Sequence, residues 1–114
     1  MSRIDRINEQ MKREISTIVH QELTDPRLAF VSITKVEVSK DLQHAKVFFS
    51  VLGNPDQVGK AEDALTNAKG AIRKMIGQRI RMRYTPDFIF IFDHSMEYSA
   101  RIEETIKDIQ NESS

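Results

Sequence analysis

Residues 29–51, AFVSITKVEVSKDLQHAKVFFSV, predict two β-strands joined by a short polar turn at residues 40–44. In the second strand every second residue from Ala45 to Val51 is apolar, so these side chains share one face. The alternation in the first strand changes phase after Ile33, which predicts a β-bulge near Thr34. Because the connection is short, the two strands are expected to pair as an antiparallel hairpin.

The segment before the hairpin predicts a long amphipathic helix. Its apolar residues recur at spacings of three and four, which places them on one face. These residues are Ile4, Ile7, Met11, Ile15, Ile18 and Val19. Pro26 disfavours helical geometry at Asp25, so the helix is expected to end there. Three arginines on a neighbouring face either bind a ligand or only keep the helix soluble: Arg3, Arg6 and Arg13.

The segment after the hairpin predicts two helices separated by a kink or break. Asn54 is suited to cap the first helix, and Pro55 is suited to its first turn. The helical pattern runs to Ala68, is interrupted by Gly70 and then resumes, which predicts a kink at Ala68-Lys69-Gly70 and a third helix beyond it. Gly70 is expected to allow a backbone geometry that a side chain would strain.

The period of the pattern changes again after the third helix. Residues 79–84 alternate arginines with Ile80, Met82 and Tyr84, which predicts an extended exit from that helix. The last strand, Phe88–Phe92, has apolar residues on both faces, which favours a central or doubly covered position in the sheet. Its phenylalanines, Phe88, Phe90 and Phe92, either pack beneath the helices or stack bases on an open sheet.

A fourth helix is predicted after the last strand, with Ser95 as its cap. Its inner positions are Met96, Ser99, Ile102, Ile106 and Ile109. Residues 111–114 are expected to be disordered. The order α-β-β-α-(kink)-α-β-α therefore predicts one α+β domain over residues 1–110, in which helices pack on one face of a three-stranded sheet.

The charges of the chain are segregated, although its formal net charge is zero. Between Ala64 and Pro86 there are six cations and no carboxylate. The cations are Lys69, Arg73, Lys74, Arg79, Arg81 and Arg83. A block of one sign is typical of a surface that faces a polyanion, and it also occurs as a solvated helix face.

The sequence offers little for catalysis, metal binding or membrane insertion. The absence of cysteine excludes disulfides and thiolate zinc sites, and the three histidines lie in separate elements. No apolar run approaches the ~18 residues of a membrane span, and the N-terminal residues lack the apolar region of a signal peptide. We therefore expect a cytoplasmic protein that is not an enzyme and has no cofactor and no metal.

Several local motifs resemble the ribosome-binding factor A family. They are Leu23-x-Asp25-Pro26-Arg27, Ser39-x-Asp41-Leu42-x-x-Ala45-x-Val47, Ser50-Val51-Leu52-Gly53, Ala68-x-Gly70, Arg81-x-Arg83-x-x-Pro86 and Phe92-Asp93-x-Ser95 into Arg101-Ile102. The resemblance implies a type II KH-like fold in which Ala68-Lys69-Gly70 replaces the usual Gly-x-x-Gly loop. It also implies a non-catalytic ribosome assembly factor that binds the free 30S subunit, supports late 16S rRNA maturation and cold adaptation, and acts with ribosome-associated GTPases.

The charge pattern and the resemblance together predict the RNA-binding residues. Phosphate contacts are expected from the six cations of residues 64–86 and from Arg3, Arg6 and Arg13, and the protein is expected to be a monomer. The alternative is a protein–protein interaction module that docks other assembly factors through a strand edge or the C-terminal helix. An enzyme acting on RNA has less support, because no acid–base or metal cluster emerges from the sequence.

Overall fold

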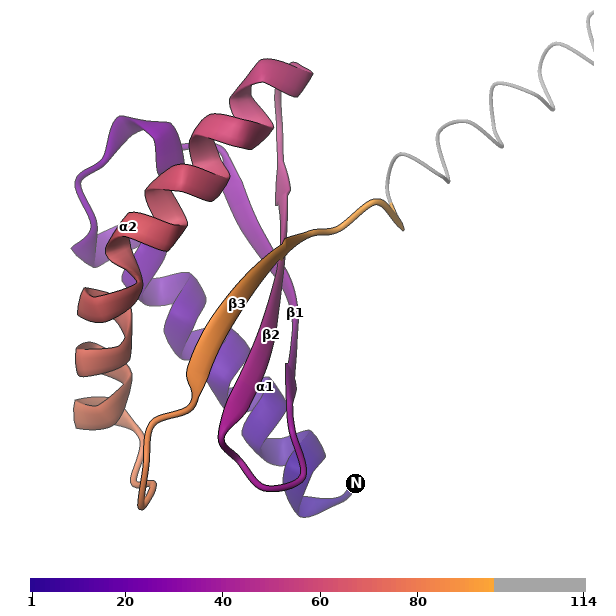
Figure 1. Cartoon of the computed structure of the whole chain (residues 1–114), viewed down its shortest axis with the longest axis vertical. Helices are drawn as coiled ribbons and strands as arrows, with labels where there is room; N and C mark the ends of the chain where they lie inside the picture. The colour runs from indigo at the N-terminus through magenta and orange to yellow at the C-terminus, as the bar shows by residue number, and fades with distance from the viewer. Residues whose placement is uncertain (96–114) are drawn as a thin grey trace, which may run out of the picture.

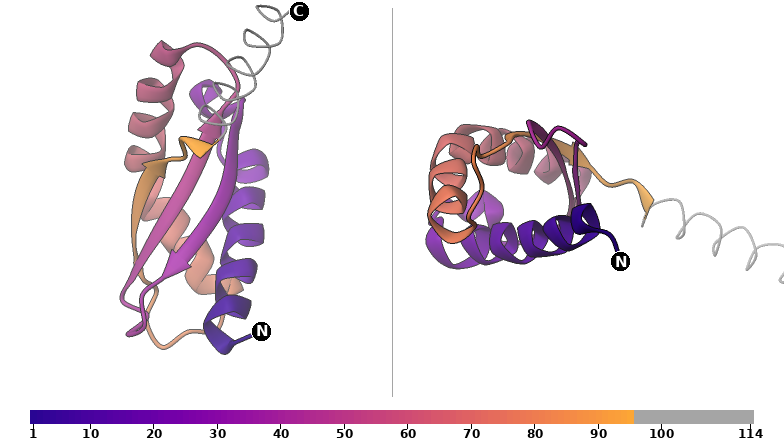
Figure 2. Two further views of the ribbon diagram at one scale, coloured as in Figure 1. Left: turned by 90° about the vertical axis from the view of Figure 1, so that its right-hand side faces the viewer. Right: turned by 90° about the horizontal axis from the view of Figure 1, so that it is seen from below.

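The computed structural model describes residues 1–95 as two long helices on one face of a three-stranded sheet (Figures 1 and 2). In chain order the elements are α1 (Arg3–Thr17), the π-helical turn η1 (Ile18–Glu22), the 3-10 turn η2 (Pro26–Leu28), β1 (Val31–Val38), β2 (His44–Val51), α2 (Pro55–Arg79) and β3 (Asp87–Phe92). The sheet has the order β1-β2-β3, in which β1 and β2 are antiparallel and β2 and β3 are parallel. The predicted α+β class is confirmed.

The hairpin of β1 and β2 has the predicted geometry. Its register shifts between Ile33 and Lys35, which confirms the bulge at Thr34. The connecting turn is held by the Asp41 carboxylate, which accepts hydrogen bonds from the Ser39 hydroxyl (2.6 Å) and the Gln43 N–H (3.1 Å). This turn also forms one wall of the candidate site.

Helix α1 begins at a capping box, in which Ser2 and Asp5 exchange side-chain and backbone hydrogen bonds. The helical backbone ends with η1, before Pro26, as predicted. Side chains from α1 and η1 also reach the edge strand β1. The Val38 N–H donates to the Asn8 side-chain oxygen (2.8 Å), and His20 Nε2 donates to the Val31 carbonyl (2.6 Å). Backbone groups at both ends of β1 are therefore already paired.

Helix α2 is continuous from Pro55 to Arg79, so the prediction of a separate third helix is wrong. Its ribbon changes direction near the middle without interruption (Figure 1). Gly70 is exposed, is not among the described residues with positive φ, and a Cβ added to it would meet no atom within 4 Å. A helical glycine of this kind weakens the helix but leaves its backbone hydrogen bonds in place, so the expected need for special geometry at Gly70 is also wrong.

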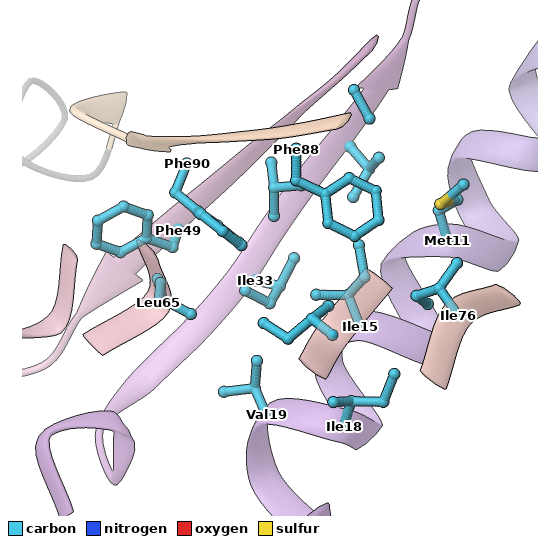
Figure 3. Packing of buried hydrophobic residues seen from close by; sticks show 14 of the residues in the cluster. Met11, Ile15, Ile18, Val19, Ile33, Phe49, Leu65, Ile76, Phe88 and Phe90 are labelled. Atoms are coloured by element: carbon cyan, nitrogen blue, oxygen red, sulfur yellow. The ribbon is translucent and has the colours of Figure 1, made fainter. Parts of the chain in front are cut away.

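The core lies between the sheet and the two helices (Figure 3). Phe88 and Phe90 point into it and are 1% and 8% exposed, so the sequence alternative in which they stack bases on an open sheet is not realised. Phe92 packs against the same core and contacts Phe49 edge to face. Strand β3 is an edge strand, contrary to the prediction of a central or doubly covered one. Its outward side chain Ile89 is 50% exposed, because both helices cover the opposite face.

The predicted fourth helix and C-terminal tail lie outside the described residues. At the end of the described part, Asp93 accepts a hydrogen bond from the Ser95 N–H (2.9 Å) and another from the Thr34 hydroxyl (2.7 Å). None of the helices within residues 1–95 is long and apolar enough to cross a membrane.

Candidate nucleic-acid interface

A groove of about 550 Å³ lies where the start of α1, the β1–β2 turn and the segment after α2 meet. Its apolar lining comes from Ile7, Leu42, Ile80 and Met82, all of which belong to the core or pack against it. Its polar lining comes from Arg3, Gln10, Asp41, Gln43, Arg81, Arg83 and Tyr84. Residues from three distant parts of the sequence thus share one concave surface.

The segment after α2 carries two of the groove's arginines. Helix α2 ends at Arg79, and Ile80 takes an extended conformation (φ −118°, ψ 126°) with its side chain buried. From there burial alternates: Met82 is half-buried, whereas Arg81 and Arg83 are exposed. The predicted extended exit from the helix is therefore confirmed. Because the apolar residues hold this segment against the core, both guanidinium groups face solvent.

Helix α1 supplies the third arginine of the groove. Arg3 lies in the first turn of α1, so tertiary packing brings it to the same groove as Arg81 and Arg83. Within residues 1–95, none of these three guanidinium groups forms an ion pair or a hydrogen bond. In the same part of the chain, Arg83 alone among them contacts an aromatic ring, that of Tyr84. Three exposed cations around one groove form a surface suited to phosphate.

One carboxylate also lines the groove in the described part of the chain, that of Asp41. Hydrogen bonds from the Ser39 hydroxyl and the Gln43 N–H lower the pKa of Asp41, because they stabilise its ionised form. The groove therefore carries cations on two walls and a fixed anion on the third, at the β1–β2 turn.

Three of the six cations in residues 64–86 instead bind acceptors within the protein. Arg79 bridges Glu14 (3.3 Å) and Glu22 (3.2 Å), and so ties the end of α2 to α1 and η1. Arg73 donates to the carbonyls of Thr85 and Pro86, both at 3.1 Å. Lys69 lies 3.4 Å from the Asp87 carboxylate at the start of β3. The contacts of Arg73 and Lys69 position the loop before β3.

Gly77 serves the same loop. A Cβ added to Gly77 would lie 3.0 Å from the Thr85 hydroxyl oxygen, so the loop packs closely against α2 at this point. Gly77 therefore leaves room for the loop of the same chain. From the sequence alone, a glycine among cations could equally leave room for a ligand.

The remaining predicted residues are exposed but lie outside the groove lining. Lys74 is on α2, and Arg6 and Arg13 are on α1. Helical periodicity places Arg6 next to Gln10, one turn away, so the basic surface extends from the groove along α1. The predicted site residues therefore divide into Arg3, Arg81 and Arg83 in the groove, Arg6, Arg13 and Lys74 on exposed helix surfaces, and Lys69, Arg73 and Arg79 in contacts within the protein.

Tyr84, Gln43 and Asp41 are not among the ligand-binding residues that the sequence predicts. Tyr84 is in the same alternation phase as the inward-facing Ile80 and Met82, yet it is 68% exposed. The alternation of buried and exposed residues stops at Tyr84 because the chain bends at residues 83 and 84, and the spacing of apolar residues does not predict this bend. The glutamine and aspartate of the turn carry a turn signal in the sequence but no ligand signal.

A second exposed apolar region lies at the opposite end of β1. Phe30 and Leu52 are 59% and 78% exposed, and the Leu52 N–H donates to the Phe30 carbonyl (3.1 Å). A smaller groove of about 250 Å³ beside Phe30 has Arg27 and Lys60 among its lining residues. Arg27 is paired with Asp25 at 2.7 Å, so this end carries less free positive charge than the groove at Arg3.

Comparisons with known proteins agree on one family. A model of the family described as ribosome-binding factor A matches residues 3–106. Among proteins of that name, the one from Halothermothrix orenii is 46% identical over 96% of this chain and 90% of its own length, and the one from Brevibacillus brevis is 43% identical over 97% and 92%.

Solved structures show the same fold. The crystal structure of ribosome-binding factor A from Thermus thermophilus has a TM-score of 0.72 and 26% identity, and the match covers 81% of this chain and 97% of that one. A second similar set of coordinates represents the Thermus thermophilus factor fitted into a cryo-electron-microscopy map of a 30S–RbfA complex. It has a TM-score of 0.64 and 28% identity, and the match covers 76% of this chain and 91% of that one.

Proposed function

The chain belongs to the ribosome-binding factor A family, and we propose that it is a non-catalytic assembly factor that binds the free 30S ribosomal subunit. The 30S complex of the Thermus thermophilus relative supports this proposal. The proposal includes contact with 16S rRNA, support of its late maturation and of growth in the cold, and action in the cytoplasm together with ribosome-associated GTPases.

The observation that carries the proposal is the groove that unites Arg3, Arg81 and Arg83. Their exposed guanidinium groups lack acceptors within the described residues, so phosphates can bind them without breaking contacts of the folded protein. Arg6 and Arg13 extend this positive surface along α1, and Lys74 adds an exposed cation on α2. Phosphate contacts provide affinity and orientation, and the shape of the folded rRNA provides selectivity.

The mechanism that we propose is a shift of population. A protein that binds one conformation of the maturing rRNA more tightly than the others increases the fraction of that conformation by its difference in affinity. This action requires no bond to be made or broken. It requires a rigid binding surface, which the packing of Ile80 and Leu42 against the core supplies at the groove.

The direct test is co-sedimentation with purified 30S subunits. The double variant R81E/R83E is expected to lose binding, because it reverses two charges in the groove. The matched control K46E/K60E reverses two exposed lysines outside the groove, changes the net charge equally and is expected to lose much less. Equal losses in the two variants would show that overall charge, rather than the groove, controls binding.

Protein docking through a strand edge is the alternative, and at the edge strand β1 two backbone groups are already bound within the protein. Asn8 and His20 occupy groups at the two ends of that strand. The other alternative surface, the C-terminal helix, lies outside the described residues. Nuclease treatment of a lysate before co-purification distinguishes the two functions, because protein partners survive the treatment and RNA-dependent ones do not.

A further inference from the structure

Tyr84 stands out among the exposed apolar side chains of the described residues. It is 68% exposed, and it is the one aromatic ring that lines the basic groove. Large aromatic surfaces are usually buried, since their exposure to water is unfavourable. An aromatic ring left open beside cations is the arrangement by which proteins hold nucleic-acid bases.

The ring of Tyr84 has a neighbour on one side. The guanidinium carbon of Arg83 lies 5.6 Å from the ring centroid, a cation–π distance. This contact places a cation on one side of the ring. The rest of the ring remains available, as its exposure shows.

We propose that the groove binds one unpaired nucleotide of the rRNA, with its base stacked on Tyr84 and its phosphates held by Arg3 and Arg81. This inference rests on the proposed function and adds the class of ligand that the site takes. The groove volume of about 550 Å³ falls within the range of about 300–1,000 Å³ that is usual for pockets of small ligands. A nucleotide requires an aromatic platform and cations together, and the groove offers both.

The third wall of the groove explains how the nucleotide is oriented. The ionised Asp41 disfavours a phosphate near the β1–β2 turn, and its carboxylate accepts hydrogen bonds from amino groups of a base. Gln10 and Gln43 each offer an amide that can donate to and accept from a base edge. With its ring stacked on Tyr84, the base therefore directs its polar edge toward the turn, while its phosphates lie toward Arg3 and Arg81.

A paired nucleotide does not fit this arrangement. In an A-form helix the bases are stacked on their neighbours, and the major groove is too deep and narrow for side chains to reach their edges. The face and the edge of a base are open together only in a bulge, a loop or a single-stranded end. The proposed ligand is therefore an unpaired nucleotide within a structured RNA.

The test is ultraviolet crosslinking of the full chain to purified 30S subunits, combined with measurement of subunit affinity. We expect a crosslinked peptide containing Tyr84, attached to a nucleotide that chemical probing finds unpaired. Tyr84→Ala should remove this crosslink and weaken affinity about 5- to 150-fold, the range for the loss of one stacked base. The salt dependence should stay the same, because no charge is removed.

Two further variants separate stacking from folding. Tyr84→Phe keeps the ring and should restore most of the affinity lost in Tyr84→Ala. Phe30→Ala removes an exposed aromatic ring at the far end of β1 and should leave the affinity within about twofold of the original.

The outcomes distinguish this inference from the proposed function. A protein that sediments with subunits but gives no crosslink in the loop 80–86, or whose Tyr84→Ala variant binds as tightly as the original, would overturn the stacking of a base and leave the proposed function intact. A crosslink to a nucleotide within a duplex would also overturn it. Failure of the original protein to sediment with subunits would overturn both.

Discussion

The side chain of Arg73 donates a hydrogen bond from Nε to the carbonyl oxygen of Pro86, 13 residues further along the chain, at 3.1 Å. A second bond joins the same guanidinium to the carbonyl of Thr85. Arg73 therefore links α2 to the loop that leads into β3. Its neighbour Lys74 has the same charge, is exposed, and makes no ion pair or hydrogen bond within residues 1–95. Of these two adjacent cations, Arg73 is therefore engaged within the protein, whereas Lys74 is free to contact a ligand.

The first prediction compares these neighbours. Arg73→Ala is expected to lower the free energy of unfolding by about 1–3 kcal/mol, because two carbonyls lose a charged donor in a half-buried site. Lys74→Ala should change it by less than about 0.5 kcal/mol. Urea unfolding followed by circular dichroism measures both. Similar values for the two variants would mean that the hydrogen bonds of Arg73 to Thr85 and Pro86 do not contribute to stability.

A second prediction concerns the glycines of α2. Gly70→Ala is expected to stabilise the protein by up to about 1 kcal/mol, since alanine is the better helix former and the added methyl group meets open space. Gly77→Ala gains the same helix propensity but places its Cβ 3.0 Å from the Thr85 hydroxyl oxygen, so it should gain less or lose stability. Thermal unfolding of the two variants tests the difference. A lower melting temperature for Gly70→Ala would restore the idea that α2 needs special backbone geometry there.

A third prediction uses the salt dependence of subunit binding to distinguish arginines that contact phosphate from arginines bound within the protein. If the exposed cations make about five phosphate contacts, the slope of log affinity against log salt for 30S subunits should be about −3.5 to −4.5. Arg81→Ala should make this slope shallower by about 0.7–0.9. Arg79→Ala removes the bridge to Glu14 and Glu22 instead, so it should leave the slope unchanged and lower stability by about 0.5–2 kcal/mol. The same change of slope in both variants would contradict the division of the basic residues into free and engaged ones.

A fourth prediction follows from Asp93. Hydrogen bonds from the Ser95 side chain, the Thr34 hydroxyl and the Ser95 N–H lower the pKa of Asp93 from 3.8 to about 2. Because the folded pKa lies below the unfolded one, the stabilisation is present above about pH 4 and is lost as the pH falls toward 2. Asp93→Asn should therefore destabilise the protein at pH 7 and flatten the dependence of stability on pH in this window.

The matched control for this acid series is Glu62→Gln, an exposed carboxylate on α2. Its free energy of unfolding at pH 7 should stay within about 0.5 kcal/mol of that of the original protein. An Asp93→Asn variant with the original pH dependence would show that the hydrogen bonds to Thr34 and Ser95 do not hold the carboxylate in its ionised form.

Local chemistry explains the parts of the fold that were predicted correctly. The first helical segment ends at Glu22, shortly before Asp25, which Pro26 keeps in an extended conformation. The change of phase after Ile33 requires a bulge to keep apolar side chains on the inner face. The interrupted helical pattern at Gly70 predicts a kink or break. A break does not occur, because the packing of α2 on the sheet offsets the low helix propensity of glycine.

The sequence alone establishes the apolar faces, the antiparallel hairpin and the clustering of positive charge between Ala64 and Pro86. Each of these features depends on residues that are close in the chain, where the spacing between residues determines which side of a helix or strand each side chain faces. Only the tertiary structure decides that Arg79 meets Glu14 and Glu22, that Arg73 meets Pro86, and that Arg3 joins Arg81 beside Tyr84. The physical reason is that a charged side chain forms a hydrogen bond or ion pair only where another element brings an acceptor within about 3 Å. The periodicity of the sequence does not determine the distance between elements that are far apart in the chain.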